Sequence, residues 1–154
     1  MTRRRRDRDG FTLVELLVVV VILALLAMLG LLKYTDLRYA AKAAAVSGDI
    51  RTITVAAFNY QADTQNWPPE AAAGVVPTGL ETYLPGFAMS NPDYTLDWDN
   101  FGVGGGAYIA GVTVTTTNPA LMAKLIRNLG SKYPYFASGS SLTYIIQEAS
   151  IPGP

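Results

Sequence analysis

A single carboxylate inside the most apolar stretch of the chain is the first candidate for chemistry. Residues 11–32 form a run of 22 residues in which Glu15 is the one charged side chain. An ionisable residue at the centre of a membrane helix costs roughly 2.5–3.5 kcal/mol and is by default a functional candidate. Near the amino-terminal end of a helix, the macrodipole favours a negative charge. We therefore expect Glu15 to have a function.

The rest of the chain offers few groups for catalysis. It contains no histidine and no cysteine, which removes the usual catalytic triads, the commonest zinc ligands and most acid–base pairs. We expect neither enzymatic activity nor a cofactor. Asp93, Asp97, Asp99 and Asn100 could offer oxygen ligands to Ca²⁺. Because Asp97 and Asp99 alternate with apolar residues, the polar face of a strand is the interpretation we favour.

The elements that position Glu15 begin with a helix of membrane length. At about 1.5 Å per residue, residues 11–32 make a helix of about 33 Å, against a bilayer core of about 30 Å. The run is apolar on every side, unlike the helix of a soluble domain. Residues 1–10 hold five arginines and two aspartates, and such positive flanks stay in the cytoplasm. We predict a segment that crosses a membrane once, with the body of the protein extracytoplasmic.

The junction of the basic leader and the apolar run carries a recognisable motif. Gly10-Phe11-Thr12-Leu13-Val14-Glu15, followed by an apolar helix, resembles the amino terminus of type IV pilins and type II secretion pseudopilins. The resemblance implies that a prepilin peptidase cuts after Gly10 and methylates the new amino-terminal Phe11. It also implies an inner-membrane assembly platform as a partner.

The resemblance gives Glu15 a role in assembly. After cleavage the carboxylate would lie near the first turn of the helix, and the free amine of Phe11 would be its positive partner. That amine belongs either to the same chain or to a neighbouring subunit, and in the second case the pair forms only in register. The alternative is that Glu15 reaches the membrane interface and has no specific role.

The helix is expected to continue beyond the membrane, over about residues 11–62. Apolar residues recur at helical spacing at Val46, Ile50, Ile53, Ala57 and Tyr60, and an earlier part of the same stripe is expected at Leu37, Ala41 and Ala44. Trp67-Pro68-Pro69 ends the pattern. Residues 33–65 therefore form the amphipathic outer half of one long helix.

Residues 66–154 are predicted to form a small α+β head. A capping box at Thr78–Glu81 predicts a short helix ended by Pro85-Gly86, and Asn118-Pro119 predicts the start of a second helix that ends at Leu129. Strands are expected at 94–98, 107–116 and 142–147, with loops at Pro134 and over 138–141. The fold class is α+β and pilin-like: a long amino-terminal helix packed on a small antiparallel sheet.

The predicted organisation is leader 1–10, transmembrane or filament-core helix 11–32, outer helix 33–65 and head 66–154. The function implied is that of a structural subunit, stored in the inner membrane and then packed with copies of itself and other pilin-like subunits into a periplasmic or extracellular filament. The alternative is a membrane-anchored minor pilin that captures a ligand or DNA. Without the leader the chain has seven basic and ten acidic side chains, a net charge of −3, which argues against general nucleic-acid binding.

Overall fold

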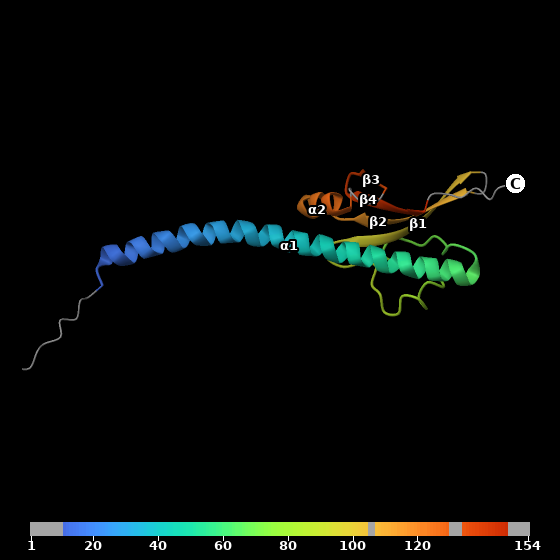
Figure 1. The fold of residues 1–154 in the computed structure, drawn as a ribbon, viewed down its shortest axis with the longest axis horizontal. Helices are drawn as coiled ribbons and strands as arrows, with labels where there is room; N and C mark the ends of the chain where they lie inside the picture. Colours follow the sequence, from blue (N-terminus) through green and yellow to red (C-terminus); the bar gives the residue numbers. More distant parts are fainter. Residues whose placement is uncertain (1–10, 105–106, 130–133, 148–154) are drawn as a thin grey trace, which may run out of the picture. The chain divides into compact units, whose positions relative to one another are not determined.

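One uninterrupted helix runs through more than a third of the chain. The computed structural model describes residues 11–104, 107–129 and 134–147, and α1 spans Leu13–Thr64 (Figure 1). The predicted helix over about 11–62 is confirmed. It ends where Gln65 adopts a positive φ of 58° and Pro68 follows shortly after. The predicted leader 1–10 lies outside the described residues.

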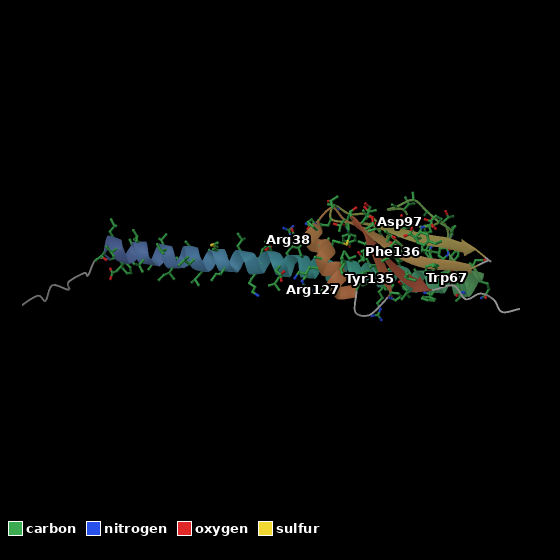
Figure 2. The ribbon with its side chains drawn as sticks, turned by 90° about the horizontal axis from the view of Figure 1, so that it is seen from above. Arg38, Trp67, Asp97, Arg127, Tyr135 and Phe136 are labelled. Atoms are coloured by element: carbon green, nitrogen blue, oxygen red, sulfur yellow. The ribbon has the colours of Figure 1, made fainter. Side chains whose placement is uncertain are left out.

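The chain divides within α1 into two compact units, one up to Arg38 and one from Tyr39 onward. In the first unit the described side chains of 11–31 are all exposed, and they project from every side of the helix (Figure 2). This segment is long and apolar enough to cross a membrane. The predicted membrane-length helix is therefore present, and the apolar side chains described over 11–31 are exposed within their own unit.

The second unit packs the outer part of α1 against a four-stranded antiparallel sheet (Figure 1). The elements are β1 (Thr95–Gly104), β2 (Ala107–Thr115), α2 (Pro119–Leu129), β3 (Tyr135–Ser138) and β4 (Ser141–Gln147), with strand order β1-β2-β4-β3. Asn118 caps α2 because its Oδ1 accepts hydrogen bonds from the backbone N–H groups of Ala120 and Leu121, at 3.0 and 3.2 Å. The predicted α+β class, second helix and three strands are confirmed, but the strand expected at 94–98 continues to Gly104 because its later residues still pair with β2.

The core of this unit lies between α1, α2 and one face of the sheet. Alternate strand residues point into it, as the pleat requires. Its buried apolar members are Ala43, Val46, Ile50, Ile53, Ala56, Ala57, Leu80, Leu84, Met89, Leu96, Trp98, Ala110, Val112, Val114, Leu121, Met122, Leu125, Leu129 and Leu142. The stripe predicted from Val46 to Ala57 is therefore confirmed, with Tyr60 partly buried against it.

The earlier part of the predicted stripe is wrong. Leu37, Ala41 and Ala44 are exposed, and Ala43 is the buried residue at that level of α1. The physical reason is that consecutive alanines, as at 43–45, place apolar residues on more than one face of the helix, so spacing alone does not identify the buried face. The sheet covers the face that contains Ala43 and Val46.

Polar contacts hold the outer part of α1 to the turn before β1. Lys42 forms a salt bridge with Asp93, and Tyr94 donates its hydroxyl hydrogen to Asp49. Burial, followed by the hydrogen bond to Asp49, raises the pKa of Tyr94 to about 12. The turn itself is ordered by Asn91, whose Oδ1 accepts from the backbone N–H groups of Asp93 and Tyr94.

The short helix predicted after Thr78 is a series of turns. Glu81 accepts a hydrogen bond from the backbone N–H of Gly79 at 2.6 Å, whereas a capping box would bring Glu81 to the N–H of Thr78. Gly79 has a φ of +88°, outside the helical region. Turns replace the helix because this glycine reverses the backbone at the position where the first helical residue was expected.

A short edge strand occupies part of the segment predicted as loop. Tyr135–Ser138 pairs with β4 as β3, and Gly139, at a φ of 59°, belongs to the two-residue connection between the strands. The burial of β3 does not alternate strongly, since only Tyr135 is partly covered. The loop prediction over 138–141 is thus wrong at both ends and right for residues 139–140.

Candidate functional site

The amino-terminal end of α1 is organised by a reciprocal pair of side chains. The backbone N–H and the hydroxyl of Thr12 donate to Glu15 Oε2 at 2.8 and 2.9 Å. In return, the backbone N–H of Glu15 donates to Thr12 Oγ1 at 3.3 Å. This is the capping-box arrangement, in which the first residue before the helix and the third residue within it satisfy each other's backbone donors.

The capping box gives Glu15 a local function that does not depend on a second chain. The first N–H groups of a helix have no partner inside it, and an unsatisfied N–H is most costly where water is scarce. The box satisfies the N–H groups of both Thr12 and Glu15. It also places the negative charge at the positive end of the helix dipole.

Of the two predicted processing residues, Phe11 is among the described residues and Gly10 is not. Phe11 precedes α1 and is 73% exposed. Gly10 lies outside the described residues. Thr12 was missed as a site residue, although its signal was present in the sequence: Thr-x-x-Glu directly before an apolar run.

The sheet brings a different acidic set together from the one predicted. Carboxylate oxygens of Glu70, Asp97 and Asp99 lie within 4.8 Å of one another, because Asp97 and Asp99 point to the same face of β1. Asp93 belongs instead to the salt bridge with Lys42. Glu70 could not be found from local spacing, since it lies in the loop after α1, far from β1 in the sequence. Its carboxylate accepts a hydrogen bond from the backbone N–H of Asn100 at 2.7 Å.

Two electrostatic features mark this acidic cluster. Burial first, and then the charges of Asp99 and Glu70, raise the pKa of Asp97 to about 6. Asp99 accepts a hydrogen bond from the Thr113 hydroxyl, and Thr113 is itself 2.7 Å from the Thr143 hydroxyl. Asp97 Oδ1 is buried and has no hydrogen-bond partner among the described residues. Three carboxylates could hold a hard cation, while the raised pKa offers protonation as the other way to relieve their repulsion.

DNA capture, the alternative function, would need basic residues on the head, and those of residues 66–154 are Lys124, Arg127 and Lys132. Arg127 is exposed and Lys124 is partly buried on α2, whereas Lys132 lies outside the described residues. Nothing in this arrangement adds support to nucleic-acid binding beyond what two cations on one helix give.

Comparison with known proteins bears directly on the amino-terminal segment. Residues 5–31 match the family described as the prokaryotic N-terminal methylation motif. This match covers the Gly10–Glu15 motif on which the resemblance rests, and it shows a prokaryotic N-terminal methylation motif at the amino terminus of the chain. No curated protein matches the chain significantly.

Among solved structures, the chain is similar to the major type IV pilin PilA1 from Clostridium difficile. The two share 22% identity over 72% of this chain and 98% of the other, with a TM-score of 0.48.

Proposed function

We propose that the chain is a pilin-like structural subunit that passes through a membrane-anchored stage and is then packed into a helical filament. The observation that carries the proposal is the methylation motif at residues 5–31 on a helix that is apolar on all sides and exposed over 11–31. An exposed apolar surface of this size needs lipid or other protein around it. A membrane stage and a filament stage supply these environments in succession.

Before assembly, the proposed location is the inner membrane, with residues 11–32 spanning it and the domain after them outside the cytoplasm. The support is the positive leader and the membrane-length helix. The proposed partners at this stage are the lipid bilayer, a prepilin peptidase and an inner-membrane assembly platform.

The processing step proposed is cleavage after Gly10 followed by methylation of the Phe11 amine. Mass spectrometry of the protein from cells with an active prepilin peptidase tests it. The expected chain begins at Phe11 and carries one added methyl group. Gly10→Ala should remain a precursor in the membrane, and a wild-type chain that keeps Met1 in those cells would contradict the proposal.

In the filament, the Glu15 carboxylate is proposed to form an ion pair with the Phe11 amine of a neighbouring subunit while it keeps its capping box. The hydrogen bonds that its carboxylate accepts from described residues all fall on Oε2. The support is therefore the second oxygen, Oε1, which can receive a positive partner without breaking the cap.

Two substitutions at Glu15 separate the cap from the charge. Glutamine can serve in a capping box but carries no charge, so Glu15→Gln should be processed, keep its helix start and assemble poorly. Glu15→Ala loses both functions and should assemble no better. Electron microscopy and counts of filaments per cell give the readout, and wild-type filament numbers from Glu15→Gln would show that the charge is dispensable.

A lateral contact between subunits is proposed for the outer part of α1. Val55 and Phe58 are 53% and 42% exposed and line a groove of about 560 Å³ between α1, Leu129 at the end of α2 and Tyr144 of β4. An assembly of this kind is open and heterologous, because each subunit offers different faces to its neighbours. Whether the filament is a type IV pilus or a type II secretion pseudopilus is best tested by the neighbouring genes, where a retraction motor indicates the first and a secretion pore the second.

A further inference from the structure

The first residues of α1 after the apolar run form a compact face of mixed chemistry. Lys33, Tyr34, Leu37 and Arg38 are all exposed, with Tyr34 at 64% and Leu37 at 66%. At 100° per residue these positions cover one continuous arc of about 140°. Within it, Lys33 lies above Leu37 and Tyr34 above Arg38, because residues four apart are neighbours on a helix. We call these four residues the outer-flank face; Arg38 is labelled in Figure 2.

The dimensions of this face match the headgroup layer of a bilayer. Lys33 follows the apolar run directly, and from Lys33 to Arg38 the helix rises about 7.5 Å. The polar region on each side of a bilayer core is about 5–7.5 Å thick. A helix whose apolar run fills the core therefore holds the whole outer-flank face at headgroup depth.

The side chains of this face suit the chemistry found at that depth. Tyrosine is enriched at membrane interfaces because its ring is apolar and its hydroxyl polar. Lysine and arginine can direct their charged ends toward lipid phosphates while their stems stay on apolar surface. Asp36, the acidic residue of this segment, lies outside the arc.

We propose that the outer-flank face is a binding surface for the headgroups of anionic phospholipids, through which the membrane-anchored subunit is held at a fixed depth. Lys33 and Arg38 bind the phosphates, Tyr34 lies at the boundary of the hydrocarbon, and Leu37 lies between the two cations in the headgroup layer. The inference rests on the membrane stage of the proposed function and adds a lipid class and the residues that select it.

Native mass spectrometry of the full chain, released from nanodiscs of phosphatidylcholine and phosphatidylglycerol, tests this surface. Each cation near an anionic surface contributes about a five-fold preference. Lys33→Gln with Arg38→Gln should therefore reduce the enrichment of retained phosphatidylglycerol over phosphatidylcholine at least five-fold. The five leader arginines are common to all variants, so they do not contribute to the difference.

Two control variants make the test specific. Arg51→Gln with Arg127→Gln removes the same charge from exposed positions outside the face and should leave the enrichment unchanged. Lys33→Arg with Arg38→Lys keeps the charges and should restore it. Raising the salt concentration should weaken the enrichment in the wild type.

Three results would overturn the proposal. The first is equal enrichment in the wild type and the Lys33→Gln, Arg38→Gln variant, and the second is an equal loss in the Arg51→Gln, Arg127→Gln control. In these cases the filament assay decides the proposed function separately. The third is a chain that does not stay in the nanodisc, which would also contradict the membrane stage.

Discussion

The helix up to Arg38 and the unit that begins at Tyr39 use the same kind of residue in opposite ways. Leu23 in the first is 59% exposed, whereas Leu125 on α2 in the second is fully buried. Both residues are helical, so secondary structure does not account for the contrast. The second unit buries its leucines among its own elements, while the first depends on a surrounding that another molecule must supply. The comparison shows that one chain can contain a unit with a buried core of its own and a helix whose described apolar residues are exposed.

Removing the first unit gives the largest expected effect. Residues 39–154 contain the whole buried core, so they should fold alone as a water-soluble domain, while the full chain should need detergent or lipid. Circular dichroism, a cooperative thermal transition and a monomeric elution volume provide the measurement. A truncated chain that aggregates or lacks a transition would mean that the second unit is not self-sufficient.

Matched leucine substitutions sharpen the comparison at single residues. Leu125→Ala should lower the free energy of unfolding of the domain by about 2–5 kcal/mol, because it leaves a cavity in a packed core. Leu23→Ala should change that free energy by less than about 0.5 kcal/mol. Denaturant unfolding of both variants in the same detergent tests the contrast. Equal losses of unfolding free energy would contradict the difference in burial between Leu125 and Leu23.

Two glycines make a similar pair with a smaller expected effect. A Cβ on Gly111 would lie 2.9 Å from the carbonyl oxygen of Tyr144 on the neighbouring strand, so Gly111→Ala should destabilise the domain by about 1–3 kcal/mol. A Cβ on Gly48 would meet nothing within 4 Å. Because alanine favours a helix interior over glycine, Gly48→Ala should stabilise by about 0.5–1 kcal/mol. A Gly111→Ala variant as stable as the wild type would contradict the close approach of β2 and β4, and a Gly48→Ala variant with a lower melting temperature would contradict the open space at Gly48.

The acidic cluster should give a small effect, and it is the one of the four predicted effects that depends on pH. The pKa of Asp97 is about 6 in the folded chain against 3.8 ordinarily, so the folded state binds this proton more tightly. The free energy of unfolding should therefore fall as pH rises from about 4 to about 6. Asp97→Asn should remove that fall and, with partial solvent screening, stabilise the domain by on the order of 1 kcal/mol at neutral pH.

A measurement of Asp97→Asn at low pH provides the control for this prediction. Near pH 4 the native carboxyl is already protonated, so Asp97→Asn should match the wild type there. A constant difference between the two proteins over the whole pH range would point to a change in hydrogen bonding and against relief of charge repulsion.

Features that depend on local sequence could be predicted, and features that depend on distant partners could not. The long helix was predicted within two residues at each end, because the apolar run and the stripe after Val46 are periodic over many turns. The Asn118 cap was predicted because the side chain that accepts and the backbone N–H groups that donate, those of Ala120 and Leu121, lie within three residues of each other in the sequence. Glu70 was missed beside Asp97 because only the folded loop after α1 brings it there.

The two Thr-x-x-Glu sequences show why a motif alone was not enough. The one at Thr78–Glu81 was predicted to begin a helix, and a glycine with positive φ prevents it. The one at Thr12–Glu15 was overlooked as a cap, and it forms the complete reciprocal box. The residue types between and after the two members of the motif decide whether it starts a helix.

The strand β3 was missed for a different reason. Phe136 is 52% exposed, and the strand has no alternation of apolar and polar residues that the sequence could reveal.

The box at the start of α1 has a consequence for the order of events on the chain. Both of its members lie on the carboxyl side of the proposed cut after Gly10, so trimming the leader would keep the hydrogen bonds between Thr12 and Glu15. Precursor and product would then share the start of α1 at Leu13, three residues beyond the proposed cut. Maturation would then change the charge and length of the chain end while leaving the architecture behind it untouched.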